Sequence, residues 1–241
     1  MNIFNIDDLK YAKNDKIIYN NYINLLDTNL IDNFINELIP KKNIKNNFKS
    51  LLNKCTENNH QLITKDILLL LEEGTGTKED LLNTIKDISI NQYDFIDKYI
   101  KLLENLKNLN FNFNTIVQDY FLFINNYEII EISNYNSLCE YNNNGVKLIG
   151  FTIFLIKLEY NGFINGYIDI IIKKLFDKIK NSINDIIIYY YILSLYELFL
   201  IVYPYYKKYN KYIIKLKQIK QNIKSKKNIF KIEDIIDHFS L

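Results

Sequence analysis

Histidine, cysteine and carboxylate side chains carry most catalysis and metal binding, and in this sequence they are scattered. The histidines are His60 and His238, and the cysteines are Cys55 and Cys139. Neither residue type shows the His-x-x-x-His or Cys-x-x-Cys spacing that gathers ligands around one metal ion. No Ser-His-Asp order or paired-carboxylate motif stands out either. The sequence therefore predicts a protein that is not an enzyme and needs no metal or cofactor.

A glycine-rich stretch, "GTGTKED" at residues 74–80, raises the question of a phosphate-binding loop. It lacks the spacing and the Lys-Ser/Thr ending that such a loop needs to cradle a phosphate. A helix start explains it better, because Thr77 and Asp80 have the spacing of a capping box. Asn91 and Asp94 have the same spacing and predict a second capping box.

A basic run between Lys207 and Lys231 contains ten lysines and no acid, with aromatic residues interleaved. Such a segment can neutralise phosphates and offer rings for stacking, so it is a candidate RNA-binding surface of low sequence selectivity. The alternative is the solvated face of a helix in a lysine-rich protein. The predicted RNA contacts are Lys207, Lys208, Lys211, Lys215, Lys220, Lys224, Lys226 and Lys227.

The composition limits the class of protein. All 30 basic residues are lysines, the net charge is +2, and 48% of the 241 residues are hydrophobic. This is a globular composition, and its excess of Asn, Ile, Lys and Tyr is typical of an AT-rich genome, such as that of a virus or a unicellular eukaryote. Two cysteines predict no disulfide framework, and the first residues show no export signal. We expect a cytoplasmic protein, in the host cytoplasm if it is viral.

One apolar stretch, Ile186–Tyr203, is long enough to raise a membrane question. It carries Ser194 and Glu197, and an acid near the centre of a bilayer costs about 2.5–3.5 kcal/mol. Because the neighbouring segments are amphipathic, the stretch predicts a buried helix rather than a membrane span.

The elements that must position these residues are almost all helical by their apolar spacing. About ten helices joined by short turns predict an all-α protein, an α-solenoid of antiparallel helical hairpins, behind a partly ordered leader. The leader is residues 1–40 and the solenoid is residues 41–241. The Asn-rich stretch from Ser133 to Gly145 is predicted to be a loop. The later helices are predicted at Phe111–Ile130, Gly145–Tyr160, Phe163–Lys180, Ser182–Tyr203, Tyr205–Ile223 and Asn228–Phe239.

Four stretches, in order and at fitting distances, resemble the middle domain of eukaryotic translation initiation factor 4-gamma. They are "FKSLLNKCTENNH", "ISINQYDFIDKYIKLLENL", "KLIGFTIFLIKLEYNGFI" and "SKKNIFKIEDIIDHF". Each stretch alone is mostly apolar spacing, and their order over residues 42–239 gives the resemblance its specificity. It implies about five HEAT-type hairpins.

The resemblance also implies a partner, because that family binds a DEAD-box RNA helicase and holds its two lobes half open. We therefore expect a monomeric scaffold that stimulates or sequesters a helicase of the initiation factor 4A type. The implied contacts form one patch in the opening hairpin and one in the later helices: Leu52, Cys55, Thr56, His60, Ile149 and Phe230. Core packing is the alternative for the apolar members and for Cys55, and a surface bystander is the alternative for His60.

The sequence departs from the family pattern at the opening hairpin. The family's "KLTP" is replaced by Lys54-Cys55-Thr56-Glu57, and His60 stands where the family has an aromatic residue. The segment Lys10–Ile18 faintly resembles the element by which initiation scaffolds hold the cap-binding subunit. Tyr11 and Ile17 match it, although a lysine replaces its leucine.

Two further functions stay open at this point. Related middle domains serve in messenger RNA decay, splicing and nuclear cap binding, with other partners. The chain could also be an RNA-binding module without a helicase partner, because the lysine-rich segment is independent of the resemblance.

Overall fold

The computed structural model describes residues 44–127, 134–203 and 210–239. The chain divides into two units, Met1–Ile44 and Lys45–Leu241, and the described helices belong almost wholly to the second. The predicted leader, with Tyr11 and Ile17, lies outside the described residues, and so do Lys207 and Lys208.

The all-α prediction is confirmed, since the described residues form helices and no strand. Two short 3-10 helices, η1 (Tyr93–Phe95) and η2 (Lys107–Leu109), separate some of the α-helices. The α-helices in this part of the chain are α4 (Ile44–Lys54), α5 (His60–Glu72), α6 (Lys78–Asn91), α7 (Ile96–Asn105), α8 (Asn114–Asn126), α9 (Tyr135–Tyr160), α10 (Ile168–Asn181), α11 (Asp185–Val202), α12 (Asn210–Lys220) and α13 (Lys226–Phe239).

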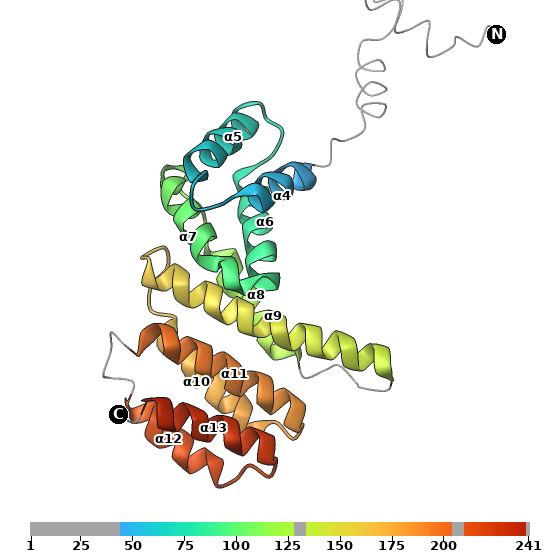
Figure 1. Ribbon diagram of the computed structural model, residues 1–241, viewed down its shortest axis with the longest axis vertical. Coiled ribbons are helices and arrows are strands. Elements are labelled where there is room, and N and C mark those ends of the chain that lie inside the picture. The colour runs from blue at the N-terminus through green and yellow to red at the C-terminus, as the bar shows by residue number, and fades with distance from the viewer. Residues whose placement is uncertain (1–43, 128–133, 204–209, 240–241) are drawn as a thin grey trace, which may run out of the picture. The chain divides into compact units, whose positions relative to one another are not determined.

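The odd-numbered helices from α5 to α13 form a continuous row, in which each contacts the next odd-numbered helix (Figure 1). The even-numbered helices α6, α8, α10 and α12 each pack against the helix that follows in sequence. This contact of every second helix is the packing of a solenoid, in which each hairpin buries its apolar stripe against its neighbours. One hydrophobic core cluster runs from Phe48 in α4 to Phe239 in α13.

The helix α9 corrects one prediction, because from Tyr135 onward it includes the Asn-rich stretch that was expected to be a loop. It begins at Tyr135, where Asn134 and Ser137 form a capping box. Tyr141, one turn further along, is completely buried. Asparagine is a weak helix former, so here the cap and the buried ring outweigh local propensity.

The two predicted capping boxes have opposite outcomes. Thr77 and Asp80 do form one: the Asp80 backbone N–H donates to Thr77 Oγ1 at 3.0 Å, and the Thr77 N–H donates to Asp80 Oδ2 at 3.1 Å. The Asn91–Asp94 box is wrong. Asn91 is the last residue of α6, and its side-chain amide donates to the carbonyl oxygen of Asp87 at 2.6 Å.

The apolar helix α11 has the length and composition of a membrane span. In the fold it contacts α9, α10 and α13, and Leu195, Leu198 and Phe199 are completely buried. The prediction of a packed helix at this position is confirmed. Burial raises the pKa of the Glu197 carboxyl, which lies on this helix; Lys231 opposes the rise and Asp94 adds to it.

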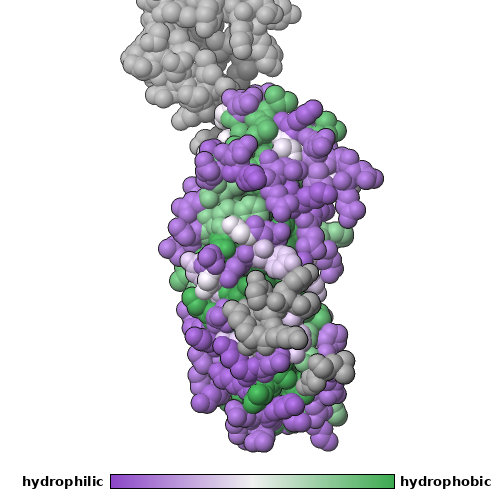
Figure 2. All heavy atoms as spheres, turned by 90° about the vertical axis from the view of Figure 1, so that its left-hand side faces the viewer, coloured by the Kyte–Doolittle hydropathy of each residue, from purple (hydrophilic) through white to green (hydrophobic). Residues whose placement is uncertain are grey.

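The surface of the described unit is mostly hydrophilic on the face that Figure 2 shows, with separate apolar patches between the polar side chains. Large exposed apolar side chains occur on several helices, among them Leu62, Leu122, Ile214 and Phe230. Single exposed apolar residues are ordinary, so only those that meet other features can define a binding surface.

Candidate binding surfaces

The bend between α4 and α5 lies at the surface. Thr56, Glu57 and Asn58 are exposed. The Asn59 side chain closes the turn: its oxygen accepts the Thr56 backbone N–H at 2.7 Å, and its nitrogen donates to the Lys54 carbonyl at 2.8 Å. The Asn59 side chain and two backbone hydrogen bonds thus hold the bend, and its polar tip is exposed.

The side chains expected to dock a partner at this bend are mostly inside the protein. Leu52, Cys55 and His60 are buried in the core, and only Thr56 of the predicted opening patch is exposed. The prediction that the three buried side chains contact a partner is corrected, because the apolar stripe to which they belong faces the core. Their role in this fold is to hold the bend.

The buried side chains of the bend are electrically neutral. Cys55 Sγ lies 3.7 Å from His60 Nδ1. Burial raises the pKa of the Cys55 thiol, which Lys98 opposes, while burial and then Lys101 lower the pKa of His60. Burial also raises the pKa of Tyr99 to about 12. A thiol with a raised pKa is a poor nucleophile, so the Cys55–His60 pair resembles no activated cysteine.

The second predicted patch is divided between interior and surface. Ile149 is buried on α9, so its predicted partner contact is corrected as well. Phe230 lies on α13 with 63% of its surface exposed. The structure therefore leaves Thr56 and Phe230, near opposite ends of the described chain, as the accessible members of the predicted set.

The lysine-rich segment folds into the α12–α13 hairpin, and several of its lysines have partners inside the protein. Lys220 Nζ lies 2.9 Å from a Glu233 carboxylate oxygen. The Lys227 ammonium lies 3.6 Å from the centre of the Tyr189 ring, while Lys211 and Lys215 lie over the rings of Tyr212 and Phe176. Of these contacts, only the Lys220–Glu233 pair offsets a lysine charge, because an aromatic ring is neutral and a lysine over it keeps its positive charge.

Lys224 and Lys226, members of the predicted RNA surface, have neither an ion pair nor a ring contact among the described residues. Both are exposed, Lys224 in the turn before α13 and Lys226 as the first residue of that helix. Lys217, which lies in the same run but was not among the predicted contacts, is also exposed on α12. Among the described members of the predicted surface, Lys220 is the one paired with a carboxylate, and the lysines over rings keep their charge.

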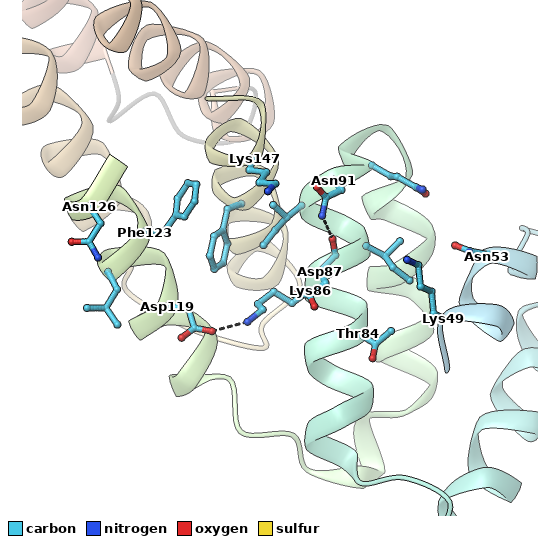
Figure 3. A pocket seen from close by; sticks show the side chains of 15 residues that line it. Lys49, Asn53, Thr84, Lys86, Asp87, Asn91, Asp119, Phe123, Asn126 and Lys147 are labelled. Atoms are coloured by element: carbon cyan, nitrogen blue, oxygen red, sulfur yellow. Dashed lines mark hydrogen bonds and ion pairs between the residues drawn. The ribbon is translucent and has the colours of Figure 1, made fainter. Parts of the chain in front are cut away.

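A groove that the sequence analysis missed has a volume of about 890 Å³ and is lined by α4, α6, α8 and α9 (Figure 3). Its apolar lining consists of Ile88, Ile90, Leu122, Phe123 and Phe151. No local motif could reveal it, because its residues come from helices about one hundred positions apart. The one available signal is Leu122, a leucine on the outer face of its helix.

The fold defines the class of this protein as an all-α, solenoid-like protein. No family model, no curated protein and no solved structure matches this chain.

Proposed function

We propose that this chain is a scaffold that binds a DEAD-box RNA helicase of the initiation factor 4A type and stimulates its cycle. The proposal is supported by the ordered resemblance of four stretches, over residues 42–239, to the middle domain of initiation factor 4-gamma. The observation that carries it is the continuous row of odd-numbered helices over one core, since such a row gives a rigid support for separated contact sites.

A rigid support can act on a two-lobed enzyme only through differential binding. It shifts the equilibrium of the lobes if it binds one arrangement more tightly than the others. In the proposed complex, the Thr56 bend contacts one lobe and Phe230 contacts the other. The buried residues Leu52, Cys55 and Ile149 act indirectly, by fixing the surfaces above them.

The test of this proposal is Phe230→Asp, measured by pull-down of purified initiation factor 4A and by its ATPase rate with and without this chain. A central aromatic anchor contributes about 2 kcal/mol or more to an interface, so we expect binding to fall by about 30-fold and ATPase stimulation to disappear. Because Phe230 is exposed, the melting temperature should hardly change.

The matched control is Ile214→Asp, which places the same charge at a site that is 60% exposed on α12. We expect this variant to bind the helicase as the unaltered chain does. Equal binding by a folded Phe230→Asp variant would contradict the contact. If the unaltered chain bound only a decay or splicing helicase in a panel, the related pathways named above would replace translation initiation.

A second candidate function, RNA binding without a helicase partner, is favoured by the free charges of Lys224 and Lys226. Two to four ammonium groups support weak, salt-sensitive binding and little base recognition. The scaffold and RNA functions would share one helix, because Lys226 lies one turn before Phe230 on α13.

A further inference from the structure

The groove between α6, α8 and α9 combines an apolar floor with a polar rim. Phe151 and Ile90 are buried beneath it, whereas Leu122 on α8 is 60% exposed and Phe123 is half-buried. Figure 3 shows Phe123 and Asn126 on one side of the groove and Asn91 on another. An exposed leucine beside a hollow with amide groups at its edge is typical of a peptide-binding groove.

The lysines that line the groove differ in whether a carboxylate of the protein already pairs with them. Lys86 Nζ contacts Asp119 Oδ2 at 2.6 Å, so this lysine is neutralised by a partner across the groove (Figure 3). Lys49 on α4 and Lys147 on α9 also line it, and neither has an ion pair among the described residues. Two ammonium groups at the rim are therefore free to attract a ligand's carboxylates.

The lining favours a peptide over a nucleic acid. A nucleic-acid groove follows the phosphate backbone with many cations and presents ring faces for stacking. This groove instead has two free lysines, two aspartates and a floor that includes aliphatic side chains, which suit leucine-like anchors. Its volume of about 890 Å³ accommodates several side chains, and its amide groups can bond to a peptide backbone.

We propose that this groove binds a short acidic segment of a partner protein that carries large apolar residues. The apolar side chains pack on Leu122 and Phe123, and the carboxylates pair with Lys49 and Lys147. Asn126 supplies an amide group for the peptide backbone, and Asn91 supplies its amide oxygen, because its amide nitrogen already donates to the Asp87 carbonyl. The proposal does not rest on helicase binding, because the groove includes neither Thr56 nor Phe230.

The experiment uses the full chain and a displayed library of random 12-residue peptides, followed by fluorescence polarisation of the enriched peptides. We expect enrichment of sequences that combine Asp or Glu with Leu or Phe. Leu122→Asp should weaken their binding at least 10-fold. The matched control is Leu62→Asp on α5, a leucine with the same 60% exposure, which should bind as the unaltered chain does.

A charge exchange tests whether Lys147 itself pairs with an acid of the peptide. Lys147→Glu should weaken the binding of an acidic peptide about 10-fold. Replacing one acid of that peptide by lysine should restore its affinity for the Lys147→Glu variant and not for the unaltered chain. The proposal is overturned if no acidic peptide is enriched, or if Leu122→Asp and Lys147→Glu leave binding unchanged. It is also overturned if Leu122→Asp and Lys147→Glu weaken the binding of a labelled oligouridine but do not weaken the binding of any peptide.

Discussion

The Cys55–His60 pair shows how burial decides the chemistry of a side chain. Both residues flank an exposed bend, yet the Cys55 thiol and the His60 ring lie in the core. Burial raises the pKa of the thiol and lowers the pKa of the imidazole, so both stay neutral. The pair is therefore a neutral, buried contact at the bend.

The lowered pKa of His60 makes stability depend on pH. The unfolded chain protonates this histidine near its ordinary value of 6.5, whereas burial and Lys101 disfavour the charged ring in the folded protein. The stabilisation is therefore complete above pH 6.5 and is lost as the pH falls towards the folded-state pKa. We expect the free energy of unfolding in urea to drop between pH 7.5 and 5.5, and His60→Gln to reduce that drop.

The control for His60→Gln is the unaltered protein, unfolded in urea over the same pH range. An equal drop in the His60→Gln variant would show that other groups, such as carboxylates, cause the whole effect.

At the level of elements, α9 packs against more of the described helices than any other, and its backbone lies very close to α6. It contacts α6, α7, α8, α10 and α11. A Cβ atom at Gly150 would lie 2.2 Å from the Ile90 carbonyl oxygen, which is backbone and cannot turn aside. Glycine is required here because the two helices approach at this point.

Gly150→Ala therefore tests the α6–α9 contact. In a free helix this change stabilises by about 1 kcal/mol, because alanine is the better helix former. Here we expect the opposite sign, a loss of about 1–3 kcal/mol as the helices are forced apart. Urea or thermal unfolding measures it. Asn143→Ala, on an exposed face of α9, should be neutral or slightly stabilising, and a Gly150→Ala variant of unchanged stability would contradict the close packing.

At the level of the whole molecule, the fold divides the predicted RNA-contacting lysines that the structure describes into two groups. Lys211, Lys215, Lys220 and Lys227 contact rings or a carboxylate, whereas Lys224 and Lys226 face solvent without such partners in the described part of the chain. Each ion pair at the surface contributes little to stability, but it lowers the charge that a polyanion meets. We therefore expect RNA to contact Lys224, in the turn before α13, and Lys226, the first residue of that helix.

The double variant Lys224→Gln with Lys226→Gln tests this assignment. Affinity for single-stranded RNA should fall, and the slope of log K against log salt should decrease by about 1.4, since each lost phosphate contact removes about 0.7. Filter binding at several salt concentrations gives both values. Lys65→Gln with Lys107→Gln removes the same charge from exposed sites elsewhere and should leave the slope unchanged. An equal loss of RNA affinity in both double variants would show that the net charge of the protein, and not these two positions, determines the binding.

The sequence by itself determined the helical class, the capping box at Thr77 and the packed helix α11. These depend on local spacing and local hydrogen bonds, which neighbouring residues set. It could not determine which side of the α4–α5 bend faces the core, and so Leu52, Cys55 and His60 were assigned to a surface. It could not extend α9 through the asparagines either, because a buried Tyr141 supports that turn.

The tertiary structure alone decided the groove and the partners of the lysines. Leu122, Lys49 and Lys147 are far apart in the chain and meet only when four helices pack. Lys220 finds Glu233 only because α12 and α13 fold back on each other. Burial and ion pairing between residues distant in the sequence depend on how whole helices are arranged. The pattern of apolar and charged residues within one segment does not reveal that arrangement.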